Sequence, residues 1–396
     1  MSGEENKKII VAMSPHKSLR DSAGQAGGDK KKRIIVAMSG GVDSSVAAKL
    51  LKDQGCDLLG IFLHFWKDEK AGEAENKCCS IEALMDARRV CSNINMPFYT
   101  LNFSHIFKKE VVDYFLNEYK KGGTPNPCIR CNKLVKLGLL IERAKQLGFD
   151  YVASGHYVRL KKTGRQYRLF RAKDKNKDQS YFLWTLTQGQ LGHLLFPLGD
   201  YKKEEVRKIA GKFKLPVASK KESQEICFIP GKSHNDFLKR YLKLKSGPIK
   251  TLDGKKVGEH QGLPLYTIGQ RRGVEIGGIG PFYVAKCDYK TNTLYVVKDG
   301  DDPALCNDKL VADNVNWIAG REPKLPLACE AVIRYRHKQV KCKIEKLKAE
   351  NNRGRYSVKF KKPQRAITPG QSVVFYRKDE VLGGGVIGCY GLSARY

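Results

Sequence analysis

The sequence predicts an α/β protein: a doubly wound parallel sheet, then a small mainly-β central domain and a C-terminal β-barrel. From residue 33, apolar strand segments alternate with segments of helical periodicity, which is typical of βαβ units. After about residue 235 the chain becomes glycine-rich, and from about residue 305 strands with strict alternation follow. We expect a disordered extension and three domains, at residues 1–29, 30–235, 236–304 and 305–396.

The elements of the first domain follow one another as strand and helix. Ser80 is expected to cap a helix, and Pro97 to introduce a strand. The expected strands are 34–38, 58–63, 98–101 and 151–154, and the expected helices are 46–54, 106–120 and 132–147. In such a sheet, ligands bind at the carboxyl ends of the strands. The segments Ser39–Ser45 and Gly155-His156 would both lie there.

The segment Ser39-Gly40-Gly41-Val42-Asp43-Ser44-Ser45 joins the first strand to the first helix. Its glycines let the backbone approach an anion, and the helix start presents N–H groups and a positive dipole. It lacks the GxxxxGK[ST] spacing of a P-loop, and with it the lysine that would reach a γ-phosphate. The pattern resembles the pyrophosphate loop of ATP-pyrophosphatases, whereas a bare Ser/Gly turn before a helix would be only an N-cap.

Charge and cysteine content limit the function classes. The 396 residues include 73 Lys and Arg but only 41 Asp and Glu, which gives a formal net charge of +32. The positive electrostatic field of such a charge indicates a polyanionic partner, although composition alone leaves a solvated lysine-rich surface as an alternative. Twelve cysteines, no signal peptide, no match to a mitochondrial transit peptide and no apolar run of transmembrane length predict a cytoplasmic protein without a membrane partner.

A proline-fixed turn, GTPNP, precedes Cys128-Ile129-Arg130-Cys131. It is expected to deliver both thiols to the start of a helix, where the helix N-terminus and Arg130 would lower the pKa of at least one of them. A zinc knuckle, a thioredoxin-like pair or an inert buried pair would be the alternatives. A third cysteine, Cys227, is expected on a short apolar strand edge after a basic polar loop.

The motifs SGGVDSS, GTPNPCxxCN, ASGHY, KDQSYFL, ESxxICFI, TIGQRRG, IRYRH and TPGQSVVFY occur along the chain in this order. This order resembles that of the tRNA-specific 2-thiouridylases, the MnmA family, over about residues 33 to 390. The resemblance favours RNA as the polyanionic partner. It also implies ATP as a substrate, Mg²⁺ bridging its phosphates with Asp43 as a candidate ligand, and tRNA as the partner.

The resemblance also implies roles for individual residues. Cys131 matches the nucleophile and Cys227 the cysteine that carries a persulfide, and the two would form a disulfide during the reaction. The implied nucleotide-binding residues are Ser39, Gly40, Gly41, Val42, Asp43, Ser44, Ser45, Val46, Leu63 and Gly155. The implied tRNA-binding residues are Asn126, Pro127, Cys128, His156, Lys177, Asp178, Gln179, Arg334, Tyr335 and Gln371. Two of these stretches have structural alternatives: 177–179 could be a solvated turn and Arg334-Tyr335 the face of an edge strand.

The implied reaction is ATP-dependent 2-thiolation of the wobble uridine, which releases AMP and pyrophosphate. A persulfide donor or relay protein would supply the sulfur. Two departures from the family pattern occur: many relatives carry Asp at the position of Cys128 and Phe at that of Leu137. Two other functions stay open, namely a small-molecule adenylating ligase and an iron–sulfur-dependent thiolase that uses Cys128, Cys131 and Cys227 as ligands.

Overall fold

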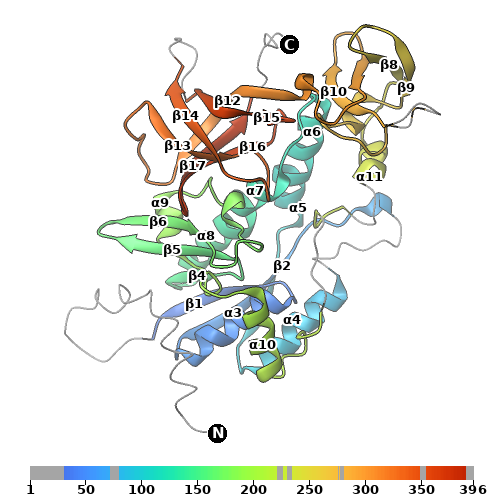
Figure 1. Ribbon diagram of the computed structural model, residues 1–396. Coiled ribbons are helices and arrows are strands. Elements are labelled where there is room, and N and C mark those ends of the chain that lie inside the picture. Colours follow the sequence, from blue (N-terminus) through green and yellow to red (C-terminus); the bar gives the residue numbers. More distant parts are fainter. Residues whose placement is uncertain are drawn as a thin grey trace.

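The structure is a computed structural model that describes residues 31–71, 80–220, 226–229, 234–274, 276, 281–347 and 354–388. The expected extension, residues 1–29, lies outside these ranges. The described chain forms a parallel sheet with helices, a small β domain and a closed barrel (Figure 1). The predicted fold class is therefore confirmed.

A five-stranded parallel sheet forms the base of the molecule, with strand order β3-β2-β1-β4-β7. Its strands are β1 (Arg33–Met38), β2 (Asp57–His64), β3 (Phe98–Asn102), β4 (Tyr151–Ala153) and β7 (Leu194–Leu195). The chain moves outward from β1 to β2 and β3, then returns to the other side of β1 with β4. The strand order thus reverses between β1 and β4, and a crevice is expected at their carboxyl ends. The loops that begin at Ser39 and Ser154 both lie at this point, as predicted.

Both faces of the sheet are covered because successive β1 side chains point in opposite directions. Ile34, Val36 and Met38 pack against the helices α3 (Val42–Asp53), α4 (Ile81–Asn93) and α10 (Lys203–Lys212). Ile35 and Ala37 belong to the core on the other face. The helices of that core are α5 (Ser104–Phe107), η2 (Lys108–Asp113), α6 (Tyr114–Lys120), α7 (Pro127–Arg130), η3 (Cys131–Leu139) and α8 (Leu140–Gln146).

Two helices begin earlier than predicted. The first begins at Val42, directly after Gly41, and not at Val46. The second was expected from Asn132 but begins at Pro127, because Pro127 fits the first helical position and the Asn126 side chain accepts a hydrogen bond from the Cys128 amide at 3.2 Å. Consequently, Cys128 lies in the first turn of the helix and Cys131 about one turn further along.

Two strand predictions also need correction. Cys227 lies in a turn and not on a strand edge, because the chain bends there to bury Phe228. The sequence pattern also predicts a strand over 329–335, but β13 ends at Val332, where the chain leaves the barrel sheet. Arg334 and Tyr335 therefore lie on a loop.

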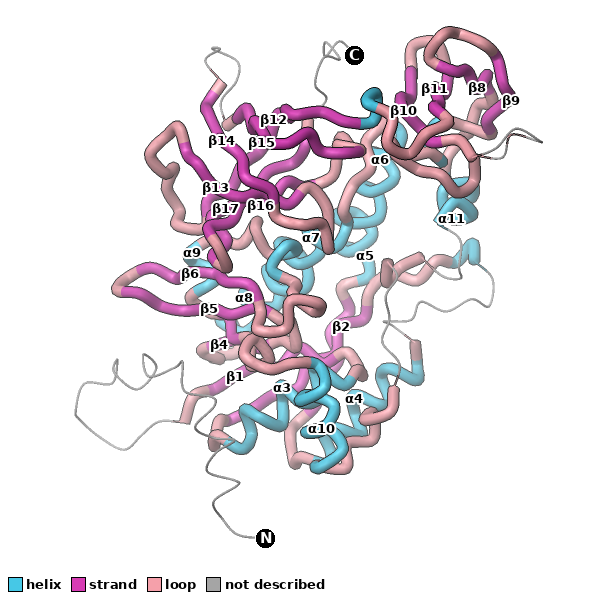
Figure 2. The backbone as a smooth tube through the Cα atoms, in the orientation of Figure 1, coloured by secondary structure: helices cyan, strands magenta, loops and turns pink. Residues whose placement is uncertain are grey.

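The barrel is closed, since the six strands ordered β12-β15-β14-β13-β16-β17 are completed by pairing of β12 with β17 (Figure 2). They are β12 (Cys306–Trp317), β13 (Leu327–Val332), β14 (Val340–Lys346), β15 (Tyr356–Arg365), β16 (Ser372–Arg377) and β17 (Glu380–Ile387), after η6 (Pro303–Leu305). A hairpin from the first half of the chain, β5 (Val158–Thr163) and β6 (Gln166–Arg171), pairs with β17 and so extends the barrel sheet.

The central domain is a small sheet with its own apolar core. Its strands, ordered β10-β11-β8-β9, are β8 (Gly247–Thr251), β9 (Lys256–His260), β10 (Tyr283–Asp288) and β11 (Thr293–Val297), with η5 (Leu263–Leu265) beside them. The remaining short helices are η1 (Glu69–Ala71), η4 (Ser180–Phe182), α9 (Gln188–Leu191) and α11 (His234–Tyr241). No helix in the described ranges is both long and apolar enough to cross a membrane.

The two glycines after β1 offer a test of the fold. Gly40 has φ +67°, and a Cβ atom there would lie 2.1 Å from the Ala83 carbonyl oxygen in α4, whereas a Cβ atom on Gly41 would meet only the Ser39 hydroxyl at 3.5 Å. We therefore expect Gly40→Ala to lower the free energy of unfolding by about 2 kcal/mol or more. The control Gly41→Ala should cost about 1 kcal/mol or less. Urea denaturation measures both, and equal losses would contradict the assignment.

Candidate active site

The segment Ser39–Ser45 forms a tight loop whose hydroxyl groups hold its shape. The Ser39 and Ser44 hydroxyls lie 3.2 Å apart, and the Ser45 hydroxyl donates to the Gly41 carbonyl at 2.8 Å. Ser39 is exposed and Gly41 and Asp43 are half-buried. The other predicted nucleotide-binding positions of this segment, Gly40, Val42, Ser44, Ser45 and Val46, are buried. The backbone amides of this segment are therefore the groups that an anion would meet, with the buried positions supporting the loop.

The loop after β4 closes against this segment. A Cβ atom on Gly155 would lie 2.7 Å from both the Asp43 carbonyl carbon and the Ser44 nitrogen, so only glycine permits the approach. Leu63, also predicted at the site, is buried with 5% exposure near the end of β2. The structure thus brings the predicted residues that follow β1 and β4 together at the switch point, while Leu63 is in the core near the end of the neighbouring strand β2.

Asp43 has two partners that the sequence analysis missed. The Tyr157 hydroxyl donates to Asp43 Oδ1 at 2.7 Å, and Lys203 Nζ lies 2.6 Å from the same oxygen. Both come from distant elements, and Lys203 is 160 residues away in sequence. No local pattern marks either residue. The Asp43 carboxylate is an oxygen ligand of the kind that Mg²⁺ would accept beside phosphate oxygens and water.

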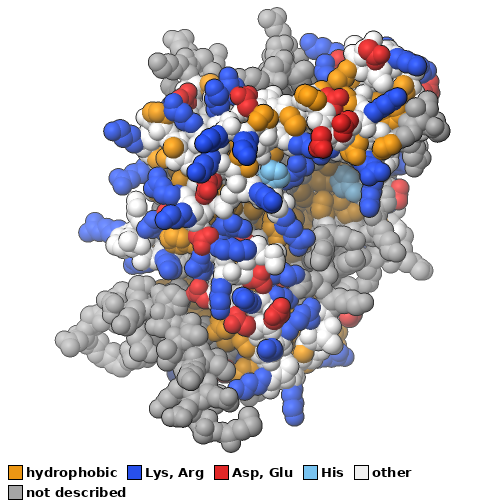
Figure 3. Space-filling view, in the orientation of Figure 1, with side chains coloured by type: hydrophobic (Ala, Val, Ile, Leu, Met, Phe, Trp, Pro, Cys, Tyr) orange, Lys and Arg blue, Asp and Glu red, His pale blue; other side chains and the backbone are white. Residues whose placement is uncertain are grey.

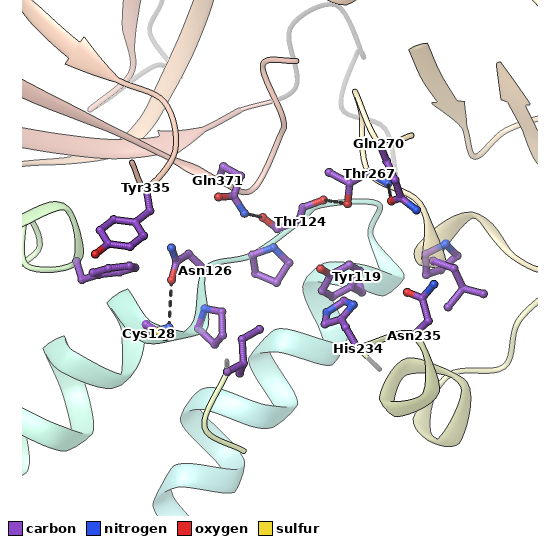
Figure 4. Close-up of a pocket in the computed structure, with 16 residues that line it drawn as sticks. Tyr119, Thr124, Asn126, Cys128, His234, Asn235, Thr267, Gln270, Tyr335 and Gln371 are labelled. Carbon is purple, nitrogen blue, oxygen red and sulfur yellow. Dashed lines mark hydrogen bonds between the residues drawn. The ribbon is translucent and has the colours of Figure 1, made fainter. Parts of the chain in front are cut away.

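A cavity of about 440 Å³ lies where the first half of the chain, the central domain and the barrel meet (Figure 4). Five predicted tRNA-binding residues line it: Asn126, Pro127, Cys128, Tyr335 and Gln371. The sequence analysis did not identify its other lining residues: Tyr119, Thr124, Pro125, Phe182, Ile226, His234, Asn235, Pro264, Leu265, Thr267 and Gln270. Of these, six belong to motifs already noted, and that membership is the signal the sequence offered: Thr124, Pro125, Phe182, Ile226, Thr267 and Gln270.

The three cysteines lie differently with respect to this cavity. Cys128 lines it, whereas Cys131 is 8% exposed in the core behind it. Cys227 packs against the same core and follows Ile226, which lines the cavity. Its other neighbour, Phe228, is buried among the rings of Phe107, Phe115 and Phe237. None of the three is disulfide-bonded in this structure, and the Cys131–Cys227 disulfide stays a prediction.

Arg130 is less available to these thiols than predicted. Its guanidinium contacts the Glu110 carboxylate at 2.7 Å and lies over the Tyr114 ring at 4.4 Å. Much of its charge is therefore balanced by Glu110. No three His, Cys, Asp or Glu side chains in the described part of the chain are grouped as metal ligands.

Residues 177–182 connect the loop at β1 with the cavity. Gln179 Oε1 accepts a hydrogen bond from the Tyr157 amide at 3.0 Å, and the Phe182 ring lies 4.5 Å from the ring of Tyr335. Asp178 is buried and accepts hydrogen bonds from the Ala172 amide, at 3.0 Å, and the Ser180 hydroxyl, at 2.9 Å. Its carboxylate therefore fixes this segment from inside.

The remaining predicted residues lie around this connection. Lys177 is half-buried, with its amide donating to Asp174 Oδ1 at 3.3 Å. Arg334 donates to the Arg365 carbonyl at 2.9 Å, and burial together with the charge of Arg365 lowers its pKa. In Figure 3, Lys and Arg side chains spread over the visible face around a recessed apolar region.

The turn that carries Asn126 is held by two other parts of the chain. Gln371 Nε2 donates to the Thr124 carbonyl at 2.7 Å, and the Thr124 amide donates to the Pro369 carbonyl at 2.9 Å. The Thr124 hydroxyl lies 3.3 Å from that of Thr267 in the central domain. The barrel and the central domain thus both fix the wall of the cavity.

His156, a predicted tRNA-binding residue, is 7% exposed. The Ser154 hydroxyl lies 2.8 Å from its Nδ1, and the ring meets Phe196 edge-on. Burial, and secondarily the charge of Lys136, lowers the pKa of His156 well below its usual value. The imidazole is therefore neutral at pH 7.

Three family models match consecutive parts of the chain: a "tRNA methyl transferase HUP domain" at residues 32–231, a "tRNA methyl transferase PRC-barrel domain" at 235–298 and an "Aminomethyltransferase beta-barrel domain" at 307–387. The tRNA-specific 2-thiouridylase MnmA 2 of Thermoanaerobacter sp. (strain X514) is 46% identical over 361 residues, covering 90% of this chain and 97% of the relative. The MnmA enzyme of Roseiflexus castenholzii is 46% identical over 373 residues, covering 90% and 99%.

The buried imidazole of His156 predicts a dependence of stability on pH. Below about pH 6.5, a histidine in the unfolded chain takes up a proton while buried His156 stays neutral, so the unfolded state binds more protons. The free energy of unfolding should therefore fall as the pH falls from 7 to 5. His156→Gln should make this fall smaller, by up to about 1.4 kcal/mol per pH unit. Urea denaturation at several pH values measures it, with exposed His105→Gln as control; an unchanged slope in His156→Gln would refute the assignment.

Proposed function

The chain belongs to the tRNA-specific 2-thiouridylase family, and we propose that its two sites perform successive halves of one reaction, the ATP-dependent 2-thiolation of the wobble uridine of tRNA. The observation that carries this proposal is the cavity at Cys128 and Ile226, which is connected through residues 157–182 to the glycine loop at β1. One site suits a nucleotide, and the other a base beside thiols. The domain limits at residues 235 and 304 belong to the same proposal.

In the first half, the glycine loop binds the phosphates of ATP. The C2 carbonyl oxygen of the uridine attacks the α-phosphorus, and the bond from that phosphorus to the bridging oxygen breaks. Pyrophosphate leaves with the electron pair, and the base becomes O-adenylated. The loop backbone at Ser39–Gly41 and the start of α3 supply N–H groups for the phosphates, with Gly155 and Leu63 at the border. Mg²⁺ bound with ATP would neutralise phosphate charge beside Asp43.

In the second half, sulfur replaces the activated oxygen. The terminal sulfur of a persulfide on Cys227 attacks C2. The Cys131 thiolate then attacks Cys227 Sγ, so that the S–S bond breaks and its electron pair stays with the sulfur on C2. AMP leaves with the former carbonyl oxygen. A Cys131–Cys227 disulfide remains, and a thiol reductant must supply two electrons before the next turnover.

The base must leave its stack so that the persulfide sulfur can reach C2, and the cavity walls suit such a flipped uridine. Tyr335 and Phe182 offer ring faces, and Asn126 and Gln371 offer amide groups. We assign His156, Lys177, Gln179 and Arg334 to contacts with the tRNA around this cavity, and Asp178 to holding them in place. The proposed sulfur source is a persulfide donor or relay protein, and the proposed compartment is the cytoplasm.

Other readings are less well supported. Two of the family-model descriptions name a tRNA methyl transferase, but methyl transfer gives no role to a pyrophosphate-type loop or to paired thiols. A small-molecule adenylating ligase would not need a cavity whose walls come from three parts of the chain. Both alternatives predict no 2-thiouridine in the product.

Replacement of the two cysteines tests the proposal. We expect Cys131→Ser and Cys227→Ser each to lower thiolation at least about 10³-fold, because each removes a sulfur that forms a bond. Binding of tRNA should stay within a few-fold, since neither thiol is a main contact. Mass spectrometry of tRNA nucleosides after incubation with ATP, Mg²⁺ and a persulfide donor measures the product.

The buried Cys91→Ser variant is the matched control for removal of a thiol in the core. It should keep catalysis once its folding has been verified. Thiolation near the wild-type rate in either active-site variant would exclude the two-cysteine mechanism. Formation of ADP in place of AMP and pyrophosphate by the wild type would exclude the assigned ATP chemistry.

A further inference from the structure

The glycine loop has no lysine of its own at the position where a P-loop carries one, yet the tertiary structure brings a lysine to it. Lys203, the first residue of α10, places its Nζ 2.6 Å from Asp43 Oδ1. Its side chain is only 9% exposed. A cation is thus fixed beside the anion-binding turn from a helix that the sequence pattern did not connect with it.

The backbone around Lys203 is held firmly, so the ammonium group stays near the loop. Its amide donates to Asp174 Oδ2 at 2.9 Å, and α10 packs through the fully buried Val206 and Ala210 into the same core as α3. The Lys203 Nζ also lies 5.7 Å from the centre of the Tyr157 ring. A lysine ammonium is a compact charge on a flexible stem, so it can exchange an oxygen partner without movement of the backbone.

The charge balance of the loop favours a role toward phosphate. Asp43 is the acidic residue in the first turn of α3, and its carboxylate would repel the phosphates of a nucleotide. Resting on the function proposed above, we infer that Lys203 binds the β- and γ-phosphates of ATP. It would stabilise the negative charge that pyrophosphate acquires when the bond from the α-phosphorus breaks. Tyr157 and Asp43 position the ammonium for this contact.

The inference separates two ligands that share one site. Pyrophosphate carries the two phosphates that Lys203 would contact, whereas AMP carries neither. A residue that only held the loop in shape would affect both ligands alike. Isothermal titration calorimetry with pyrophosphate and with AMP on the full chain therefore distinguishes a contact residue from a structural one.

We expect Lys203→Met to weaken pyrophosphate binding at least about tenfold and to leave AMP binding within about twofold. Lys203→Arg should retain part of the pyrophosphate affinity, because the charge is kept. Lys208→Met removes the same charge from the exposed side of the same helix and should change neither affinity. Equal losses for both ligands, or unchanged pyrophosphate binding, would overturn the inference.

A second pair of variants tests whether Lys203 contacts pyrophosphate or only neutralises Asp43, in a background where misfolding from an unpaired buried charge is avoided. In Asp43→Asn with Lys203→Met, neither charge remains, so no buried charge is left without a partner. This double variant should bind pyrophosphate at least about tenfold more weakly than Asp43→Asn alone. Equal affinities would show that Lys203 serves only to neutralise Asp43.

The outcome is distinguishable from failure of the proposed function. If the wild type releases no pyrophosphate from ATP in the presence of tRNA, the function is wrong. If it releases pyrophosphate while the Lys203 variants bind pyrophosphate normally, only the inference about Lys203 is wrong.

Discussion

The fixation of Thr124 by two distant parts of the chain is the constraint on which the candidate base site depends. Its backbone is bonded to Pro369 and Gln371, and its hydroxyl meets Thr267. Gly370 completes this contact, because its φ of +87° and the 2.8 Å from an added Cβ atom to the Thr124 nitrogen exclude other side chains. The prolines that follow Thr124 then aim Asn126 and Cys128 into the cavity. Without the barrel and the central domain, this turn would have no fixed wall opposite it.

The barrel is itself attached to the sheet domain through more than this contact. The β5–β6 hairpin pairs with β17, and Arg159 and Lys175 both contact the carboxylate of Asp379, at 3.1 and 2.6 Å. These ion pairs are partly exposed, so each by itself contributes little to the stability of the contact between the barrel and the sheet domain. The hairpin also pairs directly with β17, Phe170 with Glu380 and Leu169 with Val381, so backbone hydrogen bonds join the two parts of the chain beside these ion pairs.

The connection between the two sites is short and polar. The Asp43 carboxylate accepts a hydrogen bond from the Tyr157 hydroxyl, and the backbone amide of Tyr157 donates to the Gln179 side chain. Three residues after Gln179, Phe182 lines the cavity. A nucleotide that changes the partners of Asp43 would act directly on Tyr157. These contacts form a physical route by which ligands at the two proposed sites could influence one another.

Local sequence determined those features in which a backbone conformation or a strand period is encoded by neighbouring residues. The glycine turn at Gly40-Gly41, the Ser80 cap and the alternating faces of β1 are of this kind, and all three were predictable. The helix start at Pro127 was also predictable, because Asn126 is a good N-cap residue. The spacing of the apolar residues, however, indicated a start at Asn132. Only the tertiary structure decided that Lys203 meets Asp43 and that Thr267 meets Thr124. Contacts across 160 and 143 residues arise from how packed layers face one another, and no local spacing records this.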